Sequence, residues 1–210
     1  MKENQPPLSL LHLSAISAVL VFTVQPISTV GSPDPNNTTN TDYIRTSCAA
    51  TLYPDVCYTT LSAYANAVQQ DPARLARAAI GVSLSNARNA SDYVSNATAA
   101  AIHGSADNRS IAAIKDCSST LGDALDEISR SLKQMRHLGG GGQSLEFQLS
   151  NVQTWMSAAL TNEDTCTDGF QDAPDGPMKT GVCDRVVQVK QVTSNALALV
   201  NCYVSKVRTP

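Results

Sequence analysis

The sequence predicts an all-α protein, an up-down-up-down four-helix bundle preceded by a short, disulfide-stapled N-terminal helical hairpin. Apolar residues recur at steps of three and four along four long segments, which is the period of a helix with one buried face. Alternation of the strand type is scarce, and the connections between the long segments are short and rich in Gly or Pro. Four helices of similar length with short connections pack as antiparallel neighbours.

The N-terminal part is predicted to direct export. The run Leu8–Val24 is almost wholly apolar and follows Lys2, as in a secretory signal peptide, which we place at residues 1–31. The run is close to the length that spans a bilayer, so a retained anchor is the alternative. Residues 32–40 hold Pro, Asn, Thr and Ser with nothing apolar to bury, which predicts a flexible extension before a domain at residues 41–207.

Sugar acceptors and cysteines support the same route. Five Asn-x-Ser/Thr triplets are predicted glycosylation sites, at Asn36, Asn37, Asn89, Asn96 and Asn108. Asn89 and Asn96 share one face of a predicted helix, opposite the apolar residues Ile80, Leu84, Ala87, Val94 and Ile102. Six cysteines without a CxxC pair, in an exported chain, favour disulfides over a metal site.

The first cysteines enclose a proline turn. Between Cys48 and Cys57 lies Tyr53-Pro54, and proline fixes its own φ while moving the preceding residue out of the helical region. Two short helices should therefore meet here, and a Cys48–Cys57 bridge would staple them.

Four long helical segments follow, at about 72–103, 107–138, 144–172 and 180–207. Pro72 suits the start of a helix, Gly104 ends the first segment, and Asp107 or Asn108 can cap the second. The run Gly139–Gly142 is interpreted as a flexible connection, and the proline-rich residues 173–177 break the third segment. The inward side chains of the last segment are expected to be Val182, Val186, Val189, Ala196, Leu199 and Tyr203.

Apolar stripes on the second and third segments place two cysteines in the core. The second stripe is Ile114, Cys117, Leu121, Leu125, Ile128, Leu132 and Met135, and the third is Leu145, Leu149, Val152, Met156, Ala159, Cys166 and Phe170. Cys117 is thus the natural partner of Cys166. Cys183 and Cys202 remain, roughly 30 Å apart on one helix, either as free thiols buried in the bundle, which we favour, or with one of them bonded outside the chain.

Composition and motifs argue against several functional classes. The formal net charge is −3 without a basic block, so nucleic acid is not an expected partner. After the signal, the histidines are His103 and His137, both near helix ends. There is no nucleophile elbow, no HExxH motif and no phosphate-binding loop. We therefore expect no catalytic residues, no metal, no cofactor and no enzyme activity.

The pattern resembles the plant invertase and pectin methylesterase inhibitor family over about residues 41–207. The resemblance lies in Ile44, Cys48, Thr51, Tyr53-Pro54, Cys57, Leu61, Cys117, residues 121–126, residues 158–160, Asp164-Thr165-Cys166, Asp168, Phe170 and residues 193–200. It implies a four-helix bundle after a helical hairpin, with disulfides joining neighbouring cysteines in sequence order. It also implies a protein of the extracellular space and cell wall that docks in the carbohydrate cleft of a secreted enzyme.

The branch of the family decides the expected target. The invertase branch carries Pro-Lys-Phe, whereas this chain has only Pro177-Met178-Lys179 nearby, so the resemblance favours a 1:1 complex with a pectin methylesterase. The partner-binding positions that it implies are Asp123, Asp126, Thr161 and Thr165, with Ser119 where some relatives carry an acidic residue. An inhibitor of invertase and a non-inhibitory cell-wall module remain the alternatives. No membrane contact is expected after signal cleavage.

Overall fold

The computed structural model describes residues 35–104 and 106–208, and this part of the chain is helical without a strand. Three short elements come first: α1 (Pro35–Cys48), α2 (Pro54–Leu61) and, after the 3-10 turn η1 (Ser62–Tyr64), α3 (Ala65–Val68). Four long helices follow: α4 (Pro72–His103), α5 (Asn108–Arg136), α6 (Leu145–Asp168) and α7 (Pro177–Arg208). The all-α bundle with its N-terminal hairpin is confirmed. The signal-peptide prediction for residues 1–31 lies outside the described residues.

Three of the four long helices, α4, α5 and α6, begin at side chains that cap them. Asp71, Asp107 and Ser144 each have a non-helical backbone and accept a hydrogen bond from the backbone N–H three residues later, at 2.8, 3.0 and 3.2 Å. Such caps satisfy N–H groups that have no partner inside the helix. The starts of α4 and α5 therefore agree with the sequence prediction.

The connection between α6 and α7 differs from the prediction. α6 ends at Asp168 rather than at Asp172, and α7 begins at Pro177 rather than near Thr180. Phe170 is fully buried and anchors a turn that follows α6. Proline is well suited to the first position of a helix, because its fixed φ matches the helix and its missing N–H is not needed there.

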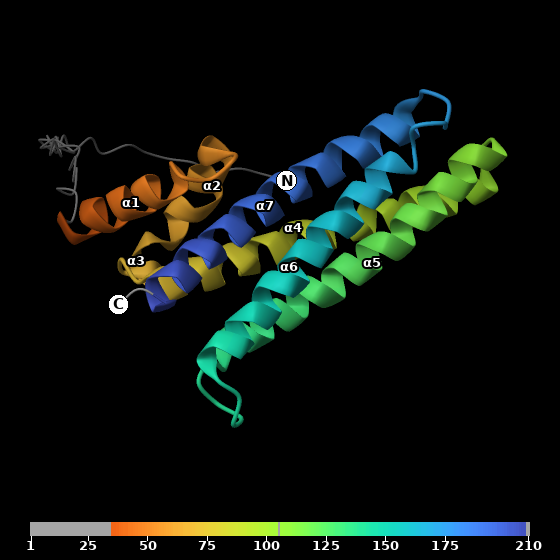
Figure 1. The fold of residues 1–210 in the computed structure, drawn as a ribbon. Coiled ribbons are helices and arrows are strands. Elements are labelled where there is room, and N and C mark those ends of the chain that lie inside the picture. The colour runs from red at the N-terminus through yellow and green to blue at the C-terminus, as the bar shows by residue number, and fades with distance from the viewer. Residues whose placement is uncertain (1–34, 105, 209–210) are drawn as a thin grey trace, which may run out of the picture. The chain divides into compact units, whose positions relative to one another are not determined.

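Each long helix packs against two others, α5 and α7 lying against both α4 and α6 (Figure 1). The buried side chains form two apolar clusters along the bundle. The larger cluster includes the inner faces of α1, α2 and α3, so the short hairpin shares the core of the bundle. The smaller cluster surrounds Cys117 and Cys166 near the other end. No helix between Pro35 and Arg208 is both long and apolar enough to cross a membrane.

The glycine-rich connection between α5 and α6 is held by one buried side chain. Gln148 accepts a hydrogen bond from the N–H of Gly139 at 2.9 Å and donates to the carbonyls of Gly140 and Gln143 at 2.7 and 3.1 Å. Gly139, Gly141 and Gly142 have φ of 81°, 80° and 75°, which glycine adopts without the cost that a Cβ would add. The loop that we expected to be flexible is thus fastened to the start of α6.

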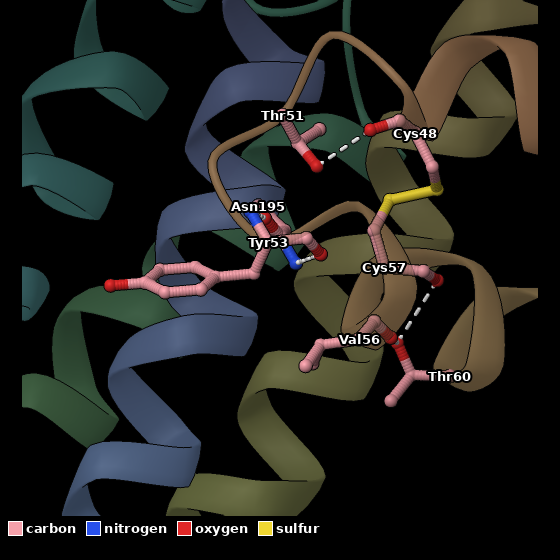
Figure 2. The surroundings of a disulfide bond; sticks show 7 residues. All are labelled: Cys48, Thr51, Tyr53, Val56, Cys57, Thr60 and Asn195. Atoms are coloured by element: carbon pink, nitrogen blue, oxygen red, sulfur yellow. Dashed lines mark hydrogen bonds between the residues drawn. A yellow bond between two sulfur atoms is a disulfide. The ribbon is translucent and has the colours of Figure 1, made fainter.

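The N-terminal hairpin is fastened to α7 by the buried Asn195 (Figure 2). The Asn195 side chain accepts from the N–H of Tyr53 at 3.1 Å and donates to the Tyr53 carbonyl at 2.9 Å. Tyr53 precedes Pro54 and has a non-helical backbone, so no helix satisfies its N–H, while its carbonyl also accepts a hydrogen bond from the Cys57 N–H of α2 at 2.9 Å. Beside them the Cys48–Cys57 disulfide joins α1 to α2, which confirms the predicted bridge.

Replacing Asn195 with alanine should lower the free energy of unfolding by about 1–3 kcal/mol. The change leaves the Tyr53 N–H without its partner, whereas the Tyr53 carbonyl keeps its hydrogen bond from the Cys57 N–H. Urea denaturation measures the loss. Asn201→Ala is the matched control, because Asn201 is exposed and its hydrogen bond with Gln153 lies at the surface; the control should cost less than about 0.5 kcal/mol. Equal losses would show that Asn195 does not fasten the hairpin.

Part of the predicted flexible extension is helical. Residues 35–40 belong to α1, and the amide of Gln70 donates to Asn40 Oδ1 at 3.2 Å. The buried side chains Ile44 and Cys48 hold the later turns of α1 against the core, and adding turns to an existing helix is easier than starting one. A polar composition alone therefore gave the wrong structure for these residues.

Several residues expected in the core are exposed or only partly buried, and Leu125 and Tyr203 are among the half-buried ones. Leu145 and Ile102 are 36% and 51% exposed, because each lies in a terminal turn of its helix, beyond the neighbouring helices that cover the apolar stripe. Cys202 is exposed and Cys183 is half-buried, and both are free thiols. The buried position that we favoured is wrong for Cys202, since it lies on an outward face of α7.

Candidate functional site

The five predicted partner-binding residues lie on the outer side of two neighbouring helices. Ser119, Asp123 and Asp126 are exposed on α5, on the side opposite the apolar residues that this helix buries in the core. Thr161 and Thr165 are exposed on α6 and are one helical turn apart. α5 and α6 pack directly against each other, so the two sets belong to adjoining surfaces.

Two crosslinks place these residues at the same level of the bundle. The Cys117–Cys166 disulfide joins the helices with a Cα–Cα distance of 4.1 Å, which confirms the predicted bridge. Farther along, the Asn162 amide donates to Glu127 Oε2 at 3.1 Å across the boundary between the helices. Glu127 follows Asp126, and Asn162 follows Thr161. We define the α5–α6 face by Ser119, Asp123, Asp126, Glu127, Thr161, Asn162 and Thr165.

The face is acidic, and none of the residues that define it carries a positive charge. Within the described residues neither Asp123 nor Asp126 forms a salt bridge. Burial raises the pKa of the Glu127 carboxyl and the negative charges of Asp123 and Asp126 raise it further, while the hydrogen bond from Asn162 and the nearby positive charge of Arg130 lower it. These carboxylates are therefore close enough to influence one another, and a partner has to meet them as a group.

The threonines add hydrogen-bond acceptors and methyl groups. Thr161 donates its hydroxyl proton to the Ser157 carbonyl at 3.1 Å, and Thr165 donates to the Thr161 carbonyl at 2.9 Å. Because both protons are used inside α6, the hydroxyl oxygens can still accept hydrogen bonds from a partner. The α5–α6 face consequently offers mostly acceptors. It suits binding better than catalysis, because it carries no nucleophile next to a base.

A buried polar network lies directly beneath the face. Glu163 is fully buried in α6 between Thr161 and Thr165; its Oε1 accepts from Thr193 Oγ1 at 2.8 Å, and the Thr193 hydroxyl is 2.8 Å from that of Ser83. Glu163 Oε2 has no hydrogen-bond partner among the described residues. Burial raises the pKa of Glu163 to about 8. On the solvent side, Asp164 forms a salt bridge with Lys190 of α7.

Asn162 and Glu163 were not among the residues predicted from the sequence. Asn162 could not be found by pattern, because a polar residue on an outward helix face carries no signal. Glu163 did have one: it lies four residues after Ala159 and three before Cys166, on the apolar stripe of α6. A carboxylate on such a stripe indicates a buried charge or a buried carboxylic acid.

The other predicted sites lie away from this face. Asn89 and Asn96 on α4 and Asn108 at the start of α5 have exposed side chains, as sugar acceptors require, and Asn36 and Asn37 fall in the first turn of α1. Their glycosylation stays a prediction. His103 and His137 are exposed at the ends of α4 and α5. In the described part of the chain no three or more His, Cys, Asp or Glu side chains gather as a metal site.

The fold resembles that of a solved inhibitor. The crystal structure of a mutant form of a pectin methylesterase inhibitor from Arabidopsis matches with a TM-score of 0.60 at 20% identity, over 75% of this chain and 95% of that one. At this identity the match supports the fold alone.

Curated relatives give a closer comparison. Pectinesterase inhibitor 3 of Arabidopsis thaliana is 40% identical over 93% of this chain and 92% of its own length. Pectinesterase inhibitor 10 of the same plant is 41% identical over 81% of this chain, which spans only 54% of that relative. Residues 42–199 match the sequence model described as Plant invertase/pectin methylesterase inhibitor. This chain therefore belongs to the plant invertase/pectin methylesterase inhibitor family.

Proposed function

We propose that this protein inhibits a pectin methylesterase by docking the α5–α6 face into the pectin-binding cleft of the enzyme. The observation that carries the proposal is a rigidly crosslinked acidic face, none of whose residues carries a positive charge, in a chain whose relatives are named pectinesterase inhibitors. The inhibitor performs no chemistry. It prevents the polysaccharide from reaching the catalytic groups.

One face on one bundle implies a 1:1 complex. Each partner contributes roughly 800 Å² to a standard interface, and in this proposal the adjoining surfaces of α5 and α6 supply it together. Export to the plant extracellular space and cell wall is supported by two disulfides and by the exposed sugar acceptors. No membrane contact is part of the proposal.

Titration against purified enzymes tests the proposal. A pectin methylesterase and an acid invertase are each titrated with the protein at constant substrate, because the family includes inhibitors of both. We expect stoichiometric loss of pectin methylesterase activity and unchanged invertase activity. Inhibition of the invertase alone would establish the alternative target, and no effect on either enzyme would leave a cell-wall module without inhibitory activity.

Replacing both Asp123 and Asp126 with asparagine should flatten the dependence of inhibition on pH. Docking buries these carboxylates near the acidic groups expected in the target cleft, and both effects favour the protonated form. The complex then takes up protons that the free proteins release, so wild-type affinity should increase as the pH falls from about 7 to about 5. Dissociation constants measured across this range for both proteins check the slope.

Asp92→Asn with Asp184→Asn is the matched control. The two residues are exposed on α4 and α7, away from the α5–α6 face, and their replacement changes the net charge by the same amount. The control should keep both the affinity and the pH slope of the wild type. If the Asp123/Asp126 variant keeps the same slope as well, these aspartates do not take part in docking.

A further inference from the structure

A basic groove lies near the opposite end of α5 from the disulfide, where α3, α4 and α5 meet. It has a volume of about 320 Å³ and is lined by Tyr64, by Arg74 and Arg77 of α4, and by Arg136 of α5. Within the described chain, Arg77 and Arg136 form no salt bridge. Arg74 donates to the neutral side chain of Gln69, which leaves its charge uncompensated as well.

The walls of the groove come from helix segments that carry charge of one sign. Between Pro72 and Ser91 the charged residues of α4 are arginines, and from Ser129 to Arg136 those of α5 are Arg130, Lys133 and Arg136. Of these three, Arg136 lines the groove, whereas Arg130 and Lys133 line a separate pocket beside Trp155 of α6. The nearest acidic group along the chain is Asp71, whose carboxylate caps the N-terminus of α4. The net negative charge of the protein is therefore distributed unevenly, with acidic residues on the α5–α6 face and basic residues around the groove.

Helix stability explains only half of this pattern. Lys133 and Arg136 lie in the last turn of α5, where a positive charge interacts favourably with the helix dipole. Arg74 lies in the first turn of α4, where a positive charge is unfavourable, although the Asp71 carboxylate caps that turn; Arg77 lies one turn farther on. The dipole of α4 favours neither arginine, and within the described residues neither forms a salt bridge, which leaves both charges available to a ligand.

The shape and chemistry of the groove fit a chain of acidic sugars. Arg74 and Arg77 are three residues apart, which places their Cβ atoms about 5–6 Å apart on one helix face. Guanidinium groups bind carboxylates through paired hydrogen bonds. Tyr64 is 43% exposed beside them, and an exposed phenol offers an apolar face and a polar hydroxyl to a sugar ring. Arginines for carboxylates, together with an aromatic ring for a sugar, distinguish this groove from a general anion site.

We propose that this groove binds a uronic acid polysaccharide, of the kind that removal of methyl esters from pectin produces. The choice of this polyanion rests on the proposed function, since the proposed target enzyme makes carboxylates on such a polymer. The groove involves none of the residues of the α5–α6 face, so one molecule can bind polymer and enzyme at the same time. Binding to de-esterified polymer concentrates the inhibitor where the enzyme has acted.

Polymer binding by Arg77→Gln/Arg136→Gln tests the proposal independently of inhibition. The purified protein is passed over immobilised polygalacturonate and over the same polymer fully methyl-esterified. The wild-type protein should bind the acidic polymer, release it as the salt concentration is raised, and show no binding to the esterified polymer. Loss of two charge-assisted contacts should weaken binding about tenfold or more. Inhibition of a pectin methylesterase should be unchanged in this variant.

The control is Arg109→Gln/Lys115→Gln, which removes the same charge from the other end of α5. It should bind polygalacturonate about as well as wild type, and Tyr64→Ala should weaken sugar binding without a change of net charge. Equal weakening in the control and groove variants would overturn the proposal, as would equal binding to the esterified polymer. Stronger binding to phosphatidylserine vesicles than to polygalacturonate would overturn it in favour of a membrane surface. If the wild-type protein binds the acidic polymer but does not inhibit the enzyme, the proposed function is contradicted while the proposed groove is not.

Discussion

Replacing Cys117 and Cys166 together with serine is expected to lower the free energy of unfolding by about 4 kcal/mol or more. The disulfide closes a loop with a sequence separation of 49, and loop-closure entropy alone gives about 4 kcal/mol for that length. Both cysteines are buried in the smaller apolar cluster, so the new hydroxyls add a cost of their own. At about 2–4 °C per kcal/mol, the melting temperature should fall by roughly 10 °C or more.

The second disulfide provides an internal comparison. Cys48 and Cys57 are separated by only 9 residues, so the same relation gives about 2–3 kcal/mol for Cys48→Ser/Cys57→Ser. Calorimetry of both double variants should rank the Cys117–Cys166 bridge first. Alanine replacements repeat the comparison without the buried hydroxyl. A melting temperature unaffected by the loss of Cys117 and Cys166 would contradict the expected role of this bridge.

Glu163→Gln should make the protein more stable than wild type at neutral pH and about as stable at pH 4.5. Burial raises the pKa of Glu163 to about 8 from the model-peptide value of 4.5, with Asp164 and Glu127 also raising it and Thr193 and Lys190 opposing the shift. Between these values the unfolded chain releases a proton that the folded protein keeps. The contribution of the protonated Glu163 to the free energy of unfolding is therefore fully present below pH 4.5 and is lost as the pH rises toward 8.

The size of the effect follows from the width of that window. Three pH units at about 1.4 kcal/mol each amount to roughly 4 kcal/mol by pH 7.5. Glutamine stays neutral and still accepts a hydrogen bond from Thr193, so its stability should lack this component. Urea denaturation of both proteins from pH 4.5 to 8 gives the two curves. Parallel curves would show that Glu163 ionises in the folded protein as easily as in the unfolded chain.

Periodicity and caps were sufficient to predict the long helices and the core bridge. The stripes on α5 and α6 placed Cys117 and Cys166 in the core, because a helix that buries one face repeats its apolar residues every three or four positions. α4 was predicted from Pro72 to His103, as the structure has it. These features depend on local sequence, and tertiary contacts did not change them.

The features that were missed depend on contacts between distant residues. α1 extends back to Pro35 through polar residues because its later turns are held in the core. Gln148 and Asn195 are buried amides whose partners are backbone groups of a glycine loop and a proline turn. No periodic pattern indicates which backbone groups lack partners. Even the resemblance to a family gave the motif around Asn195 without its structural reason.

The sequence predicted which residues belong to the candidate site but not how those residues are arranged in space. The resemblance supplied Asp123, Asp126, Thr161 and Thr165, and the structure places them on adjoining helices. The hydrogen bond between Glu127 and Asn162, which aligns the two sets, depends on how far α5 and α6 are shifted along each other. The loop length and the disulfide together set that shift, so it cannot be predicted from either helix alone.

The hydrogen bonds of Gln148 fix one end of the α5–α6 pair, and the Cys117–Cys166 disulfide fixes the pair near the other end. A two-helix surface fixed in this way is preorganised, because it need not give up much conformational entropy on meeting an enzyme. Thr161 and Thr165 already hold their rotamers through hydrogen bonds within α6. In the proposed docking, encounter with the enzyme is then limited by diffusion and electrostatic orientation rather than by rearrangement of the inhibitor.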